Sequence, residues 1–164
     1  MSMSLAMVNH QERDAMSLAM SVEEREAFLA EARVGVLGIE ALEGGAPLLV
    51  PVWYAYEPGG EVVVLTGRTS LKARRIQQAG RFSLCVQHEI APYRYVSVEG
   101  PVTAVEDRVD PDERSALAHR YLDAETAPAY LDSNRSQLED DITIRMRPER
   151  WRTADFAAFA AQFS

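Results

Sequence analysis

The stretch Leu65-Thr66-Gly67-Arg68-Thr69-Ser70-Leu71-Lys72 joins two elements of different type. Before it, residues 61–66 form a run rich in valine that predicts a β-strand. After it, residues 70–79 place apolar side chains at helical spacing, with Ser70 at the expected N-cap and Gly80 just past the end. The stretch therefore predicts a strand that leads directly into the N-terminus of a helix.

This junction concentrates groups that can hold an anion. The first backbone N–H groups of a helix have no intrahelical partner, and the helix dipole favours negative charge near them. Thr69, Ser70 and Lys72 are therefore candidates for binding a phosphate, and Lys72 is the only lysine among 17 basic residues. The same spacing is also typical of a capped helix with a solvated basic face that includes Arg68 and Arg75.

Six extended segments follow one another along the chain and are separated by tight turns. Glycine-rich turns are expected at residues 43–45 and 57–60, and a bend or bulge is expected at Gly100-Pro101. Strands in runs, without regular crossover helices, favour an antiparallel barrel over a doubly wound parallel sheet. The predicted strands span residues 33–42, 46–56, 61–66, 81–89, 93–105 and 141–146.

Three further helices are expected around these strands. Ser21 and Glu24 form a capping-box pattern ahead of a helix at residues 22–31. Asp110-Pro111 opens a helix that reaches about residue 122, because proline is well tolerated in a first helical turn. A short helix is also expected at residues 126–138.

Length and composition restrict the class of protein. A chain of 164 residues suits one domain, and we interpret residues 1–20 as an N-terminal extension and residues 21–164 as a single domain. The formal charge of −8 argues against a nucleic-acid partner, and no apolar run approaches the ~20 residues that cross a bilayer. With one cysteine and no signal-peptide pattern, we expect a cytoplasmic location.

Four short motifs resemble those of the pyridoxamine 5'-phosphate oxidase family and occur in the same order. Residues 66–72 resemble its Thr-Asn-Tyr-x-Ser-Arg-Lys junction, and residues 94–100 resemble its Arg-Gln-Val-x-Ile-Glu-Gly strand. Residues 50–53, Val-Pro-Val-Trp, resemble the strand beside the flavin ring, and residues 148–151 resemble the closing segment. The similarity covers about residues 20 to 160. It implies a mainly β fold with helices, a six-stranded antiparallel split β-barrel of Greek-key type.

The resemblance also implies a function, namely an FMN-binding oxidoreductase that is a homodimer with the cofactor at the subunit interface. By that similarity Ser70 and Lys72 hold the phosphate, and Tyr95 and Trp151 reach across the interface. The cofactor-binding residues that it implies are Pro51, Val52, Trp53, Leu65, Thr66, Gly67, Ser70, Lys72, Arg75, Tyr95 and Trp151.

Three positions depart from the family's motifs. Leu71 stands where the family has arginine, Gly67 where it has asparagine, and Tyr95 where it has a glutamine that contacts the flavin. Charge compensation of the phosphate then falls to Lys72 together with Arg68 or Arg75. The basic C-terminal segment that completes the site of the true oxidase is also replaced by Ala-Ala-Phe-Ala-Ala-Gln-Phe-Ser, so oxidation of vitamin B6 is not expected.

Two alternatives to an FMN enzyme stay open. Similar split barrels use the F-420 deazaflavin for hydride transfer, and a non-catalytic flavin-binding or sensing protein would also fit the substitutions at Leu71 and Tyr95. No catalytic acid or base is assigned, because a flavin carries the redox chemistry itself. No metal site is expected, since His10, His88 and His119 are far apart in sequence, and Cys85 is interpreted as a packed thiol.

Overall fold

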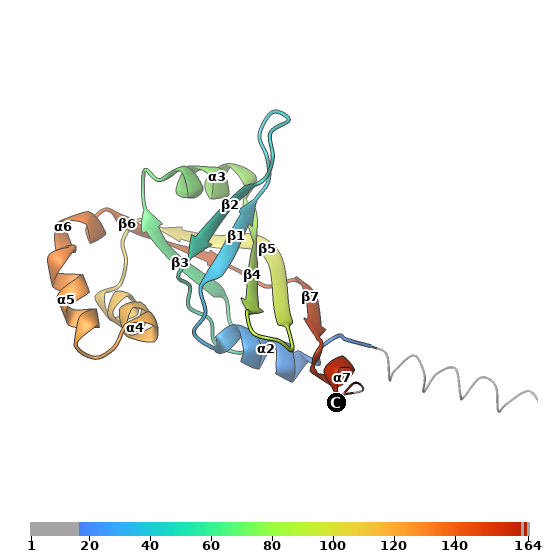
Figure 1. The fold of residues 1–164 in the computed structure, drawn as a ribbon. Helices are drawn as coiled ribbons and strands as arrows, with labels where there is room; N and C mark the ends of the chain where they lie inside the picture. Colours follow the sequence, from blue (N-terminus) through green and yellow to red (C-terminus); the bar gives the residue numbers. More distant parts are fainter. Residues whose placement is uncertain (1–16, 162, 164) are drawn as a thin grey trace, which may run out of the picture.

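The computed structural model describes residues 17–161 and residue 163. Its helices are α2 (Val22–Ala30), α3 (Leu71–Ala79), α4 (Pro111–Tyr121), α5 (Thr126–Ser133), α6 (Arg135–Leu138) and α7 (Ala157–Ala160). Its strands are β1 (Gly35–Ile39), β2 (Leu48–Val52), β3 (Val62–Gly67), β4 (Arg81–His88), β5 (Arg94–Glu106), β6 (Asp141–Met146) and β7 (Arg150–Asp155). Figure 1 shows these elements along the chain.

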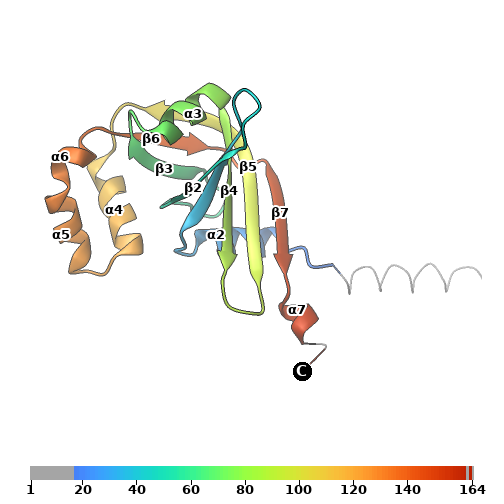
Figure 2. The same ribbon diagram turned by 45° about the horizontal axis from the view of Figure 1, so that its top comes forward.

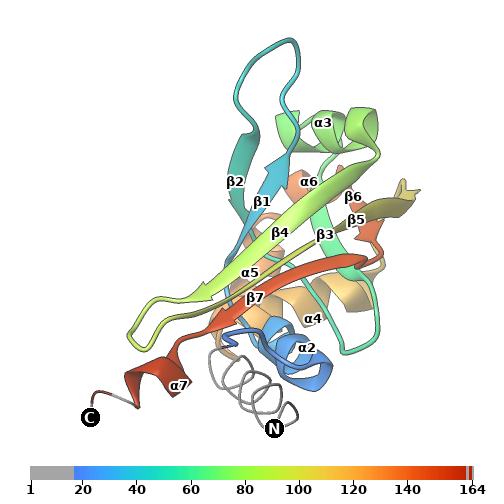
Figure 3. The same cartoon turned by 90° about the vertical axis from the view of Figure 1, so that its right-hand side faces the viewer.

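The strands form one curled antiparallel sheet in the order β2-β1-β4-β5-β6-β3, and β7 pairs with β5 outside this path. Figure 3 shows β4, β5 and β7 side by side. The prediction of a mainly β, antiparallel split barrel is confirmed, and β7 is a strand that the sequence did not predict. The alternation of apolar and polar residues along β7 is weak, because β7 is an outer strand whose residues are mostly polar.

The long strand β5 explains how the sheet curls. Residues 94–99 of β5 pair with β7, whereas residues 102–106 pair with β6, so the two halves of one strand belong to two parts of the barrel. The register shifts between Val102 and Ala104, close to the bend expected at Gly100-Pro101. Gly100 is buried, and a Cβ atom at this position would collide with the carbonyl oxygen of Arg147.

The core lies inside the curled sheet and is closed at one end by α2. Alternate residues of β3 and β4 point inward, and Phe28 and Leu29 of α2 complete the core. The capping box of α2 is confirmed, since the Ser21 hydroxyl accepts from the Glu24 amide and the Glu24 carboxylate accepts from the Ser21 amide. The buried Tyr54 hydroxyl donates to the Leu29 carbonyl oxygen over 2.7 Å and so ties α2 to the chain beyond β2.

The helices α4, α5 and α6 form a group beside the ends of β3 and β6, as Figures 1 and 2 show from two directions. The sequence predicted one helix over residues 126–138, but the structure divides it into α5 and α6 at Asn134. Strand β2 is shorter than the expected 46–56 and ends at Val52. Beyond Val52 the ladder with β1 stops: the Tyr54 amide donates to the Tyr121 hydroxyl of α4, and Ala55 forms an isolated bridge with Val63 of β3.

The N-terminal extension is only partly within the described residues. Residues 1–16 lie outside them, and residues 17–20 lie against β7: the Leu18 carbonyl accepts from the Asp155 amide over 2.8 Å, and the buried Met20 joins the core. The boundary between an extension and a single domain stays a prediction. None of the helices in the described part of the chain is long and apolar enough to span a bilayer.

Candidate functional site

The junction between β3 and α3 has the geometry that the sequence predicts. Ser70 is the N-cap of α3, and its hydroxyl accepts from the Ala73 amide over 3.1 Å. The buried Thr66 hydroxyl lies 3.1 Å from the Ser70 hydroxyl, and the Ser70 amide donates to the Gly67 carbonyl oxygen. These bonds fix the turn between strand and helix, so that Lys72 is held in the first turn of α3.

A cavity of about 220 Å³ lies beside this turn. It is bounded by the end of β2, the outer face of β3, the start of α3 and the helices α4 to α6. Its lining residues are Pro51, Val52, Trp53, Leu65, Lys72, Arg114, Leu117, Ala118, Tyr130, Leu138 and Asp141. Segments that are far apart in sequence therefore meet at one place, and most of the wall that they form is apolar or aromatic.

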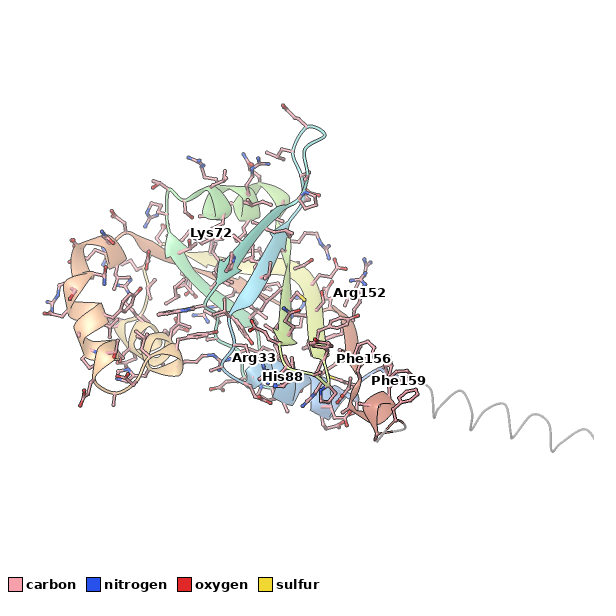
Figure 4. All side chains as sticks on the ribbon, in the orientation of Figure 1. Arg33, Lys72, His88, Arg152, Phe156 and Phe159 are labelled. Atoms are coloured by element: carbon pink, nitrogen blue, oxygen red, sulfur yellow. The ribbon has the colours of Figure 1, made fainter. Side chains whose placement is uncertain are left out.

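Three charged side chains from three elements line this cavity. Lys72 comes from α3, Arg114 from α4 and Asp141 from the first position of β6. Burial raises the pKa of the Asp141 carboxyl above its usual value, while Arg114 and Lys72 act in the opposite direction. In Figure 4, Lys72 lies below α3, at the end of the sheet opposite His88.

The aromatic part of the wall is a stack that continues into α4 and α5. The rings of Trp53 and Tyr121 are parallel within 5°, with centroids 5.0 Å apart, and the Tyr130 ring is tilted against Trp53 at 5.6 Å. The Tyr121 hydroxyl accepts from the Tyr54 amide and lies within hydrogen-bond distance of the carbonyl oxygens of Arg33 and Tyr54. One face of Trp53 is therefore covered by residues of its own chain.

The structure brings together most of the residues that the sequence implies for a cofactor. Pro51, Val52, Trp53, Leu65 and Lys72 line the cavity. Residues 66, 67 and 70 form the turn next to it. The roles of these residues in holding a cofactor stay predictions.

Three of the implied residues lie outside this cavity. Arg75 lies on α3 but does not line the cavity, and Arg68, the alternative cation, is bound to the Asp107 carboxylate over 2.8 Å. Tyr95 lies on β5 opposite Gln87 and Ala154, and its side chain is exposed. Trp151 lies on β7 under the Arg25 guanidinium, 4.6 Å from its centre. In one chain, therefore, neither aromatic residue reaches the cavity.

The sequence did not identify the contribution of α4 to β6. These elements lie between the motif at residues 94–100 and the closing motif at residues 148–151. The residues that they contribute to the lining of the cavity are Arg114, Leu117, Ala118, Tyr130, Leu138 and Asp141. Only Asp141 had a positional signal, because it precedes the alternating residues of the last predicted strand. The others come from α4, α5 and α6, and the position of these helices beside the cavity is a tertiary arrangement without a local pattern.

Other cavities and reactive groups are less closely related to the predicted residues. A larger cavity of about 510 Å³ shares Leu65 and Leu117 with the first one, and only Leu65 among the implied residues lines it. Cys85 is half-buried, and burial raises the pKa of its thiol, while its interpretation as a packed cysteine stays a prediction. Within residues 17–161 no group of three or more histidine, cysteine or acidic side chains is arranged to hold a metal ion.

Comparison with known proteins agrees with this architecture. The sequence model of one family, described as pyridoxamine 5'-phosphate oxidase, matches residues 21–153. The chain belongs to this family. The family is one of flavin-binding split barrels, so the fold and the cofactor class that the motifs imply are confirmed at this level. No curated protein matches the chain.

Solved structures share the fold of this family member. A conserved hypothetical protein from Mycobacterium tuberculosis matches with a TM-score of 0.67 and 22% identity, over 88% of this chain and 91% of that one. A protein described as an F420 reductase matches with a TM-score of 0.56 and 22% identity, over 77% and 94%. A FAD-binding protein from Mesorhizobium loti matches with a TM-score of 0.55 and 19% identity, over 82% and 94%.

Proposed function

We propose that the protein is an FMN-dependent oxidoreductase that acts as a homodimer in the cytoplasm. The observation that carries this proposal is the cavity beside the β3–α3 turn. It joins Pro51, Val52 and Trp53, which the family resemblance assigns to the flavin ring, to Lys72, which it assigns to the phosphate. An apolar and aromatic wall with a cation at one end suits a flat ring with an anionic tail.

The size of the cavity supports a second subunit. Its volume of about 220 Å³ is below the roughly 300 Å³ at which small-molecule sites usually begin, so one chain encloses only part of a flavin nucleotide. An exposed apolar face lies next to it, because a shallow hollow of about 600 Å³ also includes Pro51. A second copy on this face would complete the site. The exposed apolar residues that we assign to this face are Val34, Val36, Leu49, Ile90, Tyr93 and Tyr95.

When bound, the flavin would supply the ring that accepts and releases electrons or hydride. The chain's own residues would bind and orient it. Lys72 at the start of α3 would hold the phosphate, aided by the helix dipole and the free N–H groups of the first turn. Trp53 and Leu65 would exclude water from the ring, and the hydroxyl pair of Thr66 and Ser70 keeps the turn in place.

An F-420 deazaflavin enzyme is the second candidate. It is favoured by Arg114, which extends the basic lining beyond α3 toward α4, because a longer anionic tail needs cations farther from the first turn. The fold match to an F420 reductase is consistent with this choice. A non-catalytic flavin-binding protein is favoured by a different observation, namely that the Tyr121 ring already covers one face of Trp53.

A titration distinguishes the three candidates. The purified protein is titrated separately with FMN and F-420, with absorbance and fluorescence of each cofactor as the readout. Micromolar or tighter binding of FMN is expected, followed by turnover of NAD(P)H by the loaded protein. Binding of F-420 alone would replace FMN by the deazaflavin. Binding of FMN without turnover would favour a binding or sensing protein, and binding of neither would contradict the proposal.

A further inference from the structure

No ion pair joins the three charged side chains that line the cavity. Among the described residues, neither Lys72 nor Arg114 forms an ion pair within 4.0 Å, although Asp141 lines the same cavity. The Nε atom of Arg114 is buried and has no hydrogen-bond partner. A buried donor of this kind is costly unless something accepts from it. The cavity therefore presents two unpaired cations, one from α3 and one from α4.

Arg114 takes the place of a cation that the motif lacks. At position 71 the chain has leucine, and this side chain is exposed. The two arginines that the sequence offered as substitutes are not available to the cavity, since Arg68 is bound to Asp107 and Arg75 does not line it. Of the arginines in the described part of the chain, only Arg114 lines the cavity together with Lys72.

Asp141 opposes these two cations. It lies opposite Gly67 in the β3–β6 ladder, and a Cβ atom on Gly67 would lie 3.9 Å from the Asp141 carboxylate. The charged groups that act on it are Arg114 from α4, Lys72 from α3 and the neighbouring Asp140. When Asp141 is ionised, the three lining charges sum to +1, and when it is protonated they sum to +2. An anion in the cavity would be bound more tightly in the second state.

We propose that Lys72 and Arg114 together hold a phosphate monoester in this cavity, and that the Asp141 carboxylate weakens this binding whenever it is ionised. The protein would then bind and release its phosphate-bearing ligand in response to pH. This inference rests on the proposed function for the identity of the ligand, because FMN carries such a phosphate. The charge arrangement itself does not depend on the flavin.

The direction of the pH effect follows from the surroundings of Asp141. Burial raises the pKa of its carboxyl, so protonation on acidification occurs at a higher pH than for an exposed aspartate. Protonation removes the repulsion between Asp141 and the phosphate. The phosphate of the free ligand also titrates, with a second pKa near 6, and this contribution is common to all variants when two proteins are compared at the same pH.

The test compares FMN with riboflavin, which lacks the phosphate. Affinities are measured by calorimetry at several pH values for the wild type, Lys72→Gln, Arg114→Gln and Asp141→Asn. Exposed residues supply matched controls, since Arg74→Gln and Asp112→Asn make the same charge changes on the surface, and neither residue is among the groups that act on Asp141. Thermal unfolding of each variant shows that it is folded. The ratio of the two affinities isolates the contribution of the phosphate.

We expect the FMN-to-riboflavin preference to fall about tenfold in Lys72→Gln and in Arg114→Gln, and to rise about tenfold in Asp141→Asn. As the pH falls and Asp141 becomes protonated, the FMN-to-riboflavin preference of the wild type should approach that of Asp141→Asn. The controls should leave it unchanged. If Lys72→Gln lowers the preference but Arg114→Gln and Asp141→Asn do not alter it, the inference is wrong and the proposed function stands.

A second probe separates this inference from the flavin itself. Inorganic pyrophosphate is titrated into the same proteins in the absence of any flavin. If the wild type binds neither FMN nor riboflavin, the proposed function fails. The inference about the charges then survives only if pyrophosphate binding is weakened by Arg114→Gln and strengthened by Asp141→Asn. Absence of pyrophosphate binding in that case would overturn it as well.

Discussion

The two tryptophans of the chain lie in regions that are built differently. Trp53 follows β2 and lines the cavity, where it stacks on Tyr121 at 5.0 Å. Trp151 lies on β7, with the Arg25 guanidinium over its ring. The rings of Trp151 and Tyr56 form a T-shaped contact, with their centroids 6.3 Å apart. Trp151 lines a different cavity, together with Arg25 and Tyr56. The family resemblance assigns both to one cofactor, so the two assignments agree only if Trp151 comes from a second copy of the chain.

The two regions also differ in the contacts that position their residues. The Trp53 region depends on contacts between distant segments, because β2, β3, α3 and α4 each supply part of its wall. The Trp151 region depends on a regular ladder between β5 and β7, in which Val98 is opposite Trp151. We therefore expect substitutions of the residues that line the cavity to change ligand binding directly, and substitutions in the β5–β7 ladder to change folding or assembly and, through assembly, the cofactor site.

The largest expected effect is at Gly100, which lies between the half of β5 that pairs with β7 and the half that pairs with β6. Gly100→Ala should destabilise the protein by about 3 kcal/mol, since the added Cβ meets the Arg147 carbonyl oxygen, which is backbone and cannot swing away. Urea denaturation measures the loss. In Gly38→Ala the Cβ makes only ordinary contacts, and a similar loss there would show that the position of Gly100 is not special.

The next effect tests whether the two regions meet across a dimer. Lys72→Ala and Trp151→Ala should each lower FMN affinity at least tenfold in the homodimer, because one removes a charge-assisted contact and the other an aromatic one. In a mixed dimer of the two variants, half of the sites should regain wild-type affinity if Trp151 comes from the partner. If both residues belong to a site in one chain, every site keeps one defect and none recovers.

A smaller effect concerns the link between Trp53 and α4. Tyr121→Phe leaves the Tyr54 amide without its acceptor, so we expect a loss of about 1–2 kcal/mol in the free energy of unfolding and a change in Trp53 fluorescence. Tyr130→Phe is the matched control, because Tyr130 touches Trp53 through its ring and no hydrogen bond of its hydroxyl occurs among the described residues. Equal losses in the two variants would assign the stability to ring packing instead.

The smallest effect concerns Asp141 in the protein without ligand. Its pKa is raised in the folded state, so ionisation costs stability above the folded-state pKa and nothing below the pKa of the unfolded chain. Asp141→Asn should therefore stabilise the protein at pH 7, by less than about 1 kcal/mol because the site is partly solvated. The gain should disappear on acidification toward pH 4, near the usual aspartate value of 3.8. A gain that does not change with pH would contradict this cause.

The sequence predicted the elements whose signals are local. Strand β6 occupies residues 141–146 as expected, because Ile142 and Ile144 alternate with polar neighbours and pack inside the barrel. Helix α3 begins after Ser70 and ends at Gly80, which adopts the left-handed conformation with φ of 68° that glycine allows. Strand β7 was missed, since Arg150, Arg152 and Asp155 place charges on a strand at the edge of the sheet.

The candidate site was predictable only in part, for a related reason. The motifs identified the half of the wall that β2, β3 and α3 supply, because each motif is a short segment with its own pattern. Arg114 and Asp141 reach the cavity through the packing of α4 and the register of β6 against β3, which no short segment encodes. A single sequence also cannot show that Arg68 forms an ion pair with Asp107.

The open side of the barrel has a consequence for hydrogen exchange. Strand β2 is one end of the sheet order and β3 is the other, and the cavity lies where Val52 and Leu65 bring these ends together. Apart from the bridge between Ala55 and Val63, each end strand has only one neighbour, so their outward amides exchange with solvent through small local openings. A ligand in the cavity would slow deuterium uptake in both end strands at once, although they stand at opposite ends of the strand order.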